Sequence, residues 1–150
     1  MGGNLSELYR VGFRVNWGDC DAAGIIYTPR VLDYAMEALE GWYIDYLDCN
    51  WYDLNVKDGM GVPTVRMECD FAAPIVPGQE FMAVVRIEKT GTSSITYKVS
   101  GIDSKTNKTL FNARFVACFI QRPQFKSIPI PHIYKEKIEK YFEFSQQNQL

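Results

Sequence analysis

The sequence predicts an α+β domain in which an antiparallel sheet packs against one long helix. The prediction depends on three observations. Bulky apolar side chains recur at helical spacing near the N-terminus, four strand-like segments follow, and short polar turns separate those segments. A length of 150 residues favours one domain, spanning 1–150. Its core is expected at about 9–131 and a C-terminal helix at about 131–143.

The first expected strand covers residues 9 to 17 and is half-buried. Its apolar and polar residues alternate, so that Val11, Phe13, Val15 and Trp17 share the buried face.

The long helix is expected from Pro29 to about Leu47, because apolar side chains recur every three or four residues along it. Thr28 is the expected N-cap and Pro29 the first helical residue, since a proline there leaves no N–H unpaired. Large apolar side chains along this helix indicate burial against a sheet, which is expected to wrap around it. These positions are Leu32, Ala35, Met36, Leu39, Trp42, Tyr43 and Tyr46.

The remainder divides into an irregular stretch at 48–61, four strands and a terminal amphipathic helix. β-Branched and aromatic residues predict the strands, and Pro77-Gly78 and residues 104–108 predict hairpin turns. The expected strands are 62–73, 79–90, 93–103 and 109–121. In the last strand, one face carries Phe111, Ala113, Phe115, Ala117 and Phe119.

Composition and charge argue against several classes of function. The net charge of −2, without a basic stripe, argues against nucleic acid as a partner. No apolar run approaches the length of a membrane span, so no membrane partner is expected. The four cysteines form no CxxC pair and there is one histidine, so no metal site is expected. Reduced thiols fit a cytoplasmic protein.

The stretch WGDCDAAGIIYTP, residues 17–29, places two aspartates and a run of small residues directly before the long helix. From the residues alone, Asp21 is either a loop residue that makes an Asx-type turn or an acid that acts together with the helix N-terminus on one substrate. The first N–H groups of a helix lack intrahelical partners and lie at the positive end of its dipole. Gly24 allows a sharp turn and a close approach of substrate to the backbone.

Together with the order of elements, this stretch resembles the hot-dog-fold acyl-CoA thioesterases, and among them the 4-hydroxybenzoyl-CoA thioesterase group with its pattern D-x-D-x-x-G-[IV]-[IV]-[YW] before a helix. Weaker matches are PIVPGQEF at 74–81 and KTGTSS at 89–94, and the resemblance covers roughly 9–131. It implies an antiparallel sheet wrapped around one central helix. It also implies hydrolysis of a coenzyme A thioester without a further cofactor, and a homodimer or homotetramer with active sites between subunits.

The resemblance assigns catalytic roles to two positions. Asp21 matches the family's catalytic aspartate and would either attack the thioester carbonyl or deprotonate a water, and the sequence leaves both routes open. The backbone N–H of Thr28 would hold the oxyanion, because Pro29 has no N–H to donate. One such donor is worth about 3 kcal/mol in the transition state.

Residues near the helix are expected to bind the substrate. Besides Gly24, the expected pocket walls are Tyr27, Met36 and Phe71, which suit an aryl or a short-to-medium acyl group. By the resemblance, Lys89, Thr92, Ser93 and Ser94 lie near the nucleotide or pantetheine end of coenzyme A; a solvated hairpin is an equally good interpretation. Equally good candidates for binding coenzyme A are Arg86, Arg114 and Arg122.

Other interpretations stay open for the neighbours of Asp21 and for the whole chain. Asp19 is expected to be a solvated or turn-forming residue, and Cys20 a small buried hydrophobe rather than a nucleophile. A non-catalytic acyl-CoA-binding or regulatory module would keep the pocket without needing Asp21. A hydroxyacyl thioester dehydratase generally pairs a histidine with a carboxylate, and His132 lies outside the loop and helix concerned.

Overall fold

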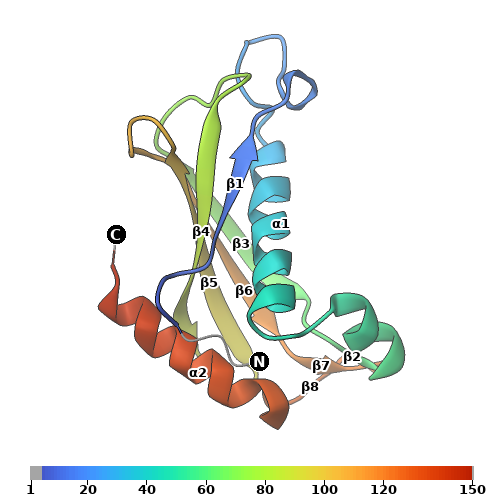
Figure 1. Ribbon diagram of the computed structural model, residues 1–150. Helices are drawn as coiled ribbons and strands as arrows, with labels where there is room; N and C mark the ends of the chain where they lie inside the picture. Colours follow the sequence, from blue (N-terminus) through green and yellow to red (C-terminus); the bar gives the residue numbers. More distant parts are fainter. Residues whose placement is uncertain (1–4, 150) are drawn as a thin grey trace.

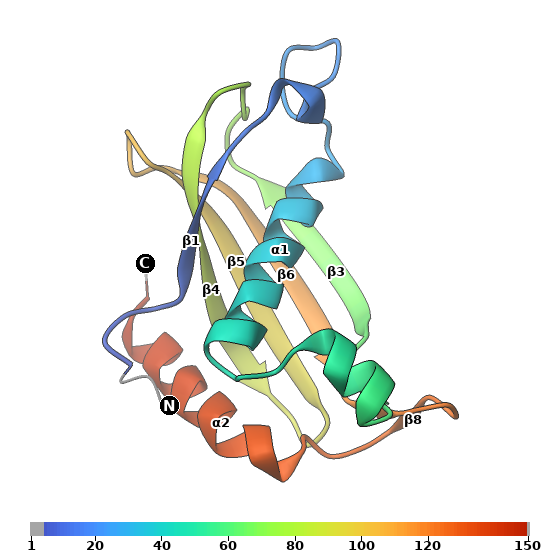
Figure 2. The same ribbon diagram turned by 45° about the vertical axis from the view of Figure 1, so that its right-hand side comes forward.

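The computed structural model describes residues 5–149 as a five-stranded antiparallel sheet that curves around one side of a long helix (Figures 1 and 2). The strand order is β1-β4-β5-β6-β3, which leaves β1 and β3 at the two edges. The α+β class is therefore confirmed. The sheet contains β1 (Arg10–Arg14), β3 (Thr64–Phe71), β4 (Glu80–Thr90), β5 (Ser94–Asp103) and β6 (Thr109–Cys118).

Two helices and a small second sheet complete the domain. The long helix α1 (Arg30–Asp45) runs along the main sheet, and α2 (His132–Gln147) crosses near the end where α1 finishes (Figure 1). The second sheet has the order β2-β7-β8 and consists of β2 (Met60–Gly61), β7 (Ile120–Gln121) and β8 (Lys126–Ser127).

The core lies between α1 and the facing side of the sheet. Burial alternates along β5 and β6, as expected for strands with one face against a helix. All five apolar residues predicted to share a face from Phe111 to Phe119 are buried. Trp42 of α1 is fully buried and contacts the rings of four tyrosines, with centroids 5.1–5.6 Å away. These are Tyr43, Tyr46, Tyr97 and Tyr141.

The predicted helix is confirmed, but its cap is not. Pro29 occupies the N-cap position and no side chain caps the helix, so the prediction for Thr28 is wrong. Pro29 already has helical dihedral angles of −64° and −22°. The helix begins with a backbone hydrogen bond instead of a side-chain cap. The N–H of Arg30 donates to the carbonyl of Tyr27 at 2.8 Å.

The first strand is shorter than predicted, and Trp17 is not in the core. β1 ends at Arg14, and Trp17 lies in a short helical turn, Trp17–Asp19, with 80% of its surface exposed. The alternation of residue types continues beyond Arg14, but the backbone turns, since the N–H of Asp19 donates to the carbonyl of Asn16 at 3.1 Å. Val15 is buried as predicted.

Residues 48–61 are not irregular, which corrects the prediction for this stretch. They contain a helical segment that includes η2 (Asp53–Lys57), followed by β2. Asn50 lies directly before this segment, and its Oδ1 accepts the N–H of Tyr52 at 2.8 Å and so caps it.

The C-terminal helix is longer than predicted because its last turn packs on β4. The hydroxyl of Ser145 accepts the N–H of Ile87 at 3.2 Å, and the hydroxyl of Tyr141 donates to the carbonyl of Val85 at 2.7 Å. Ser145 is therefore buried although the sequence around it is polar.

Asp103 organises the turn at 104–108 and makes folding stability sensitive to acid. Its Oδ2 accepts from Gln79 at 2.6 Å, and its Oδ1 accepts the N–H groups of Lys105 and Thr106. The hydrogen bond from Gln79, followed by those from Thr106, lowers the pKa of Asp103 from 3.8 to about 2. A depressed pKa stabilises the fold above pH 3.8 and loses that contribution as the pH falls through about 2.

We therefore expect Asp103→Asn to be destabilised at pH 7 but to lose less stability than the wild type between pH 4 and pH 2. Urea unfolding midpoints measured across this range test the expectation. Asp58→Asn changes an exposed aspartate and serves as the control. Parallel pH profiles for the wild type and Asp103→Asn would contradict the assignment.

Candidate active site

The loop between β1 and α1, residues 17–28, forms a tight elbow. The N–H of Tyr27 donates to the carbonyl of Asp19 at 2.8 Å, and that of Asp21 to the carbonyl of Ile25 at 3.0 Å. Gly24 turns the chain at a φ of +77°, which an L side chain rarely adopts. The N–H of Ile26 donates to the carbonyl of Ile75 at 2.8 Å, which ties the elbow to the segment after β3.

The start of α1 offers a free backbone donor beside an apolar cavity. Within residues 5–149, no hydrogen bond uses the N–H of Thr28. Thr28 lines a cavity of about 350 Å³, which we call the elbow cavity. Because the N-terminal end of the helix dipole is positive, this is a favourable place for an oxyanion. The cavity is lined by Ile25, Ile26, Thr28, Phe71 and residues 72–75.

Asp21 is exposed, and its carboxylate makes the Asx-type turn that the sequence allowed. Its Oδ1 accepts the N–H of Ala23 at 2.8 Å. Among the described residues, its Oδ2 has no hydrogen-bond partner, and Asp21 does not line the elbow cavity of the same chain. The elbow thus carries both Asp21 and Thr28, while the catalytic role of Asp21 stays a prediction.

Asp19 anchors the elbow to α1, which corrects the interpretation of a solvated residue. Its Oδ2 accepts the hydroxyl of Tyr34 at 2.5 Å, and its Oδ1 lies 3.8 Å from the Nε of Arg30. Burial first, and then the hydrogen bond to Asp19, raises the pKa of Tyr34 to about 12, so Tyr34 stays a donor. The spacing of Asp19 and Tyr34 gave no signal of this contact, because it depends on how the elbow folds back.

Cys20 is protonated at neutral pH. Desolvation, followed by the charges of Asp19 and Asp21, raises the pKa of its thiol. Since the thiolate is the reactive form, this environment argues against Cys20 as a nucleophile.

The expected pocket walls do not meet in one cavity. Phe71 lines the elbow cavity with Thr28, and its role as a wall of the substrate pocket stays a prediction. Tyr27 is 55% exposed and lines neither of the two cavities discussed here. Met36 lines a second cavity, about 12 Å farther along α1 by the helical rise from Thr28.

The candidate coenzyme A residues at the β4–β5 turn lie at the far end of the sheet from the elbow (Figure 1). The elbow is next to the start of β4, and Lys89 is near its end, roughly 30 Å away at the rise of a strand. One copy of the chain therefore does not bring Thr92, Ser93 or Ser94 to Asp21. Their role in binding coenzyme A stays a prediction.

Of the three alternative arginines, two already have partners. Arg86 is buried and donates to the carbonyl of Asn148. Arg114 bridges Glu68 and Glu88 on the outer face of the sheet. Arg122 is exposed, and no ion pair within residues 5–149 involves it.

Comparison with known families decides what kind of protein carries this elbow. Residues 15–138 match the model of the thioesterase-like superfamily. The chain belongs to this superfamily. A thioesterase-superfamily structure from Jannaschia sp. CCS1 is 34% identical, with a TM-score of 0.82 over 94% of this chain and 97% of that one.

Two further structures of thioesterases share the fold at lower identity. A 1,4-dihydroxy-2-naphthoyl-CoA thioesterase from Synechocystis is 20% identical, with a TM-score of 0.81 over 88% of this chain and 96% of that one. A DHNA-CoA thioesterase from Staphylococcus aureus is 17% identical, with a TM-score of 0.82 over 94% of this chain and 95% of that one. The predicted hot-dog fold is thereby confirmed.

Two further observations concern the described part of this thioesterase-like chain. None of its helices has both the length and the apolar character needed to cross a bilayer. Between residues 5 and 149, no three histidine, cysteine, aspartate or glutamate side chains gather where they could hold a metal ion.

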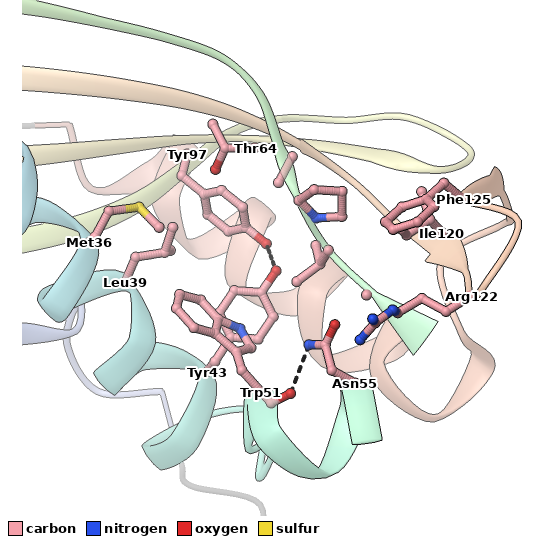
Figure 3. A pocket seen from close by; sticks show the side chains of 14 residues that line it. Met36, Leu39, Tyr43, Trp51, Asn55, Thr64, Tyr97, Ile120, Arg122 and Phe125 are labelled. Atoms are coloured by element: carbon pink, nitrogen blue, oxygen red, sulfur yellow. Dashed lines mark hydrogen bonds between the residues drawn. The ribbon is translucent and has the colours of Figure 1, made fainter. Parts of the chain in front are cut away.

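Sequence reasoning missed the second cavity, which we call the α1–β7 cavity. It has a volume of about 270 Å³ and lies between α1, the helical segment after Asn50, the start of β3 and the β7–β8 hairpin (Figure 3). Trp51 and Asn55, four residues apart, were the available signal, because that spacing puts both on one side of a helix. The lining includes Met36, Leu39, Tyr43, Trp51, Asn55, Thr64, Tyr97, Arg122 and Phe125.

Proposed function

We propose that this protein hydrolyses an acyl-CoA thioester to the free acid and coenzyme A at its elbow. Membership of the thioesterase-like superfamily supports thioester hydrolysis in general. The observation that carries the specific proposal is the N–H of Thr28, which has no hydrogen-bond partner within residues 5–149. It lies beside an apolar cavity, on the loop that also bears Asp21.

In this proposal the N–H of Thr28 stabilises the negative charge that develops on the thioester oxygen. The donor is fixed by the backbone and backed by the helix dipole, so it needs no reorganisation when the charge forms. The side chain of Thr28 has no assigned part.

Asp21 acts on the carbonyl carbon by one of two routes, either directly or through a water molecule. As a nucleophile, it would form a mixed anhydride and release coenzyme A as the thiolate, and water would then hydrolyse the anhydride. As a general base, it would take a proton from the water that attacks the thioester. The free Oδ2 suits either route.

The elbow cavity supports an aryl or a short-to-medium acyl group as the substrate. Its lining is apolar, with Phe71 as the aromatic wall. Structural relatives named as thioesterases of 1,4-dihydroxy-2-naphthoyl-CoA and of gentisyl-coenzyme A give further support for an aryl group.

The free thiols of all four cysteines support a cytoplasmic location.

A homodimer through the free edge of β3 is part of this proposal. β3 is the last strand of the sheet, and Val65, Met67 and Phe71 on it are 65%, 51% and 48% exposed. An apolar edge strand is a template for pairing with a second strand. Antiparallel pairing of two copies would bring the start of one β3 to the end of the other, and so the α1–β7 cavity of one copy towards the partner's elbow.

A panel of acyl-CoA thioesters, from acetyl through long-chain to benzoyl and hydroxybenzoyl, tests the proposal with a colorimetric thiol reagent. We expect thiol release with a clear preference for one acyl class. Absence of release from every thioester, combined with a raised melting temperature in their presence, would instead support the acyl-CoA-binding module.

A further inference from the structure

The elbow has few buried contacts of its own, since Ile26 is its one buried side chain. Its first arm bears Asp19 and Asp21, and its second arm, with Ile26, continues into α1. Two backbone hydrogen bonds join the arms, one from Tyr27 to Asp19 and one from Asp21 to Ile25. Because an isolated pair of strands is only marginally stable in water, a further contact is expected to hold the elbow in shape.

The two arms are held in different ways. The second arm is fixed by the burial of Ile26 and by α1, which begins just after Thr28. The first arm has no buried side chain, although it carries the carboxylate of Asp21. Within residues 5–149, one side-chain hydrogen bond joins the elbow to a helix or strand, and it runs from Tyr34 in the second turn of α1 to Asp19 on the first arm. This contact therefore controls where the first arm lies relative to the second.

Tyr34 is a rigid donor because its ring belongs to the core. The ring packs between Phe13 of β1 and Phe81 of β4, with centroids 5.1 and 5.5 Å away. The raised pKa of its hydroxyl, about 12, keeps the proton in place at neutral pH. Asp19 thus accepts a hydrogen bond from a fixed point of the core and not from another part of the loop.

We propose that Asp19 and Tyr34 are positioning residues, which hold the carboxylate of Asp21 in place relative to the N–H of Thr28. We call this pair the elbow clamp. The proposal rests on the function proposed above, in which both groups must reach one thioester carbonyl at the same time. Neither clamp residue lines the elbow cavity, so the clamp affects the rate of the reaction and not the binding of the acyl group. A displacement of about 1 Å at reacting groups costs roughly 10²-fold in rate.

Tyr34→Phe removes the hydroxyl and keeps the ring in its place. We expect kcat for thioester hydrolysis to fall about 10–100-fold while KM stays within about threefold, because positioning is lost and the cavity is unchanged. Tyr46→Phe is the matched control, since the hydroxyl of Tyr46 donates to the carbonyl of Lys137 at 3.0 Å at the other end of α1. Its kcat should stay within about twofold of the wild type. Equal falls in both variants, or a normal kcat in Tyr34→Phe, would overturn the proposal.

Two substitutions of Asp19 separate its contact from its charge. Asp19→Asn keeps an oxygen that accepts from Tyr34 and should retain most of the activity, whereas Asp19→Ala should lose as much kcat as Tyr34→Phe. The ion pair of Asp19 with Arg30 is largely exposed and contributes little. The double variant of Asp19→Ala and Tyr34→Phe should be no slower than either single variant, because both remove one contact. Activity of Asp19→Asn as low as that of Asp19→Ala, or additive losses in the double variant, would overturn the clamp.

Backbone amide signals test the clamp without turnover. The N–H of Ala23 donates to Asp21, and that of Thr28 is the proposed oxyanion donor, so both report the geometry of the elbow in a ¹H–¹⁵N spectrum. Tyr34→Phe should shift or broaden both signals, and Tyr46→Phe should leave them in place. Unchanged signals in Tyr34→Phe would overturn the clamp even if the wild type hydrolyses thioesters. Shifted signals in a protein that hydrolyses no thioester would support the hold of the clamp on the elbow and overturn only the proposed hydrolysis.

Discussion

Asp21→Asn is expected to lower thioester turnover by about 10²–10⁴-fold while acyl-CoA binding is largely retained. The amide keeps the shape of the carboxylate and can still accept the N–H of Ala23, so the elbow should keep its turn. It can neither attack the carbonyl nor take a proton from water. Thiol release gives turnover, and the concentration dependence of the melting temperature gives binding.

Asp33→Asn is the matched control for this variant. Asp33 is an exposed carboxylate in the first turn of α1 and pairs with Arg30. Its substitution by asparagine therefore removes one negative charge from the same region and leaves the hydrogen bonds of the elbow turn in place. Its turnover should stay within about twofold of the wild type. Near-normal turnover in a folded Asp21→Asn protein would remove Asp21 from the mechanism.

Trp42→Ala is expected to lower the free energy of unfolding by about 3–5 kcal/mol. The indole is fully buried and contacts four tyrosine rings that come from α1 and its C-cap, β5 and α2. Its removal leaves a cavity where these three elements meet, and they cannot all move in to fill it. Chemical denaturation measures the loss.

Trp42→Phe separates the ring from the N–H. Trp42 Nε1 is buried without a hydrogen-bond partner in the described structure, so phenylalanine removes an unpaired donor while it keeps an aromatic ring. Its loss of stability should be clearly smaller than that of alanine. A loss below about 1 kcal/mol for Trp42→Ala would show that this aromatic cluster is not central to stability.

Local periodicity was sufficient to predict the main elements. The three-to-four spacing along α1 and the alternation from Phe111 to Phe119 both identify the buried face, because one face of each element packs on the core. Periodicity failed where the backbone turns within an alternating stretch, as at Trp17. It also failed at 48–61, where Asn50 caps a helical segment, because asparagine both forms turns and caps helices.

The elbow and the α1–β7 cavity differ in how far the sequence could predict them. Asp21 and Thr28 are close in sequence, so one motif was enough to place both on the elbow. The α1–β7 cavity instead brings together Met36, Trp51 and Arg122 from three separate segments. No local pattern encodes that closeness, since it depends on how the β7–β8 hairpin and the helical segment pack on α1.

The two edges of the sheet set a limit on how far the chain can assemble. β1 has five residues and begins and ends with arginine, whereas β3 has eight residues and exposes apolar side chains. Two copies joined through β3 would leave only β1 edges at their outer limits. A short strand with a charge at each end is a poor template for further pairing. In the dimer proposed above, pairing of strand edges would therefore stop at two copies and would not continue into a polymer.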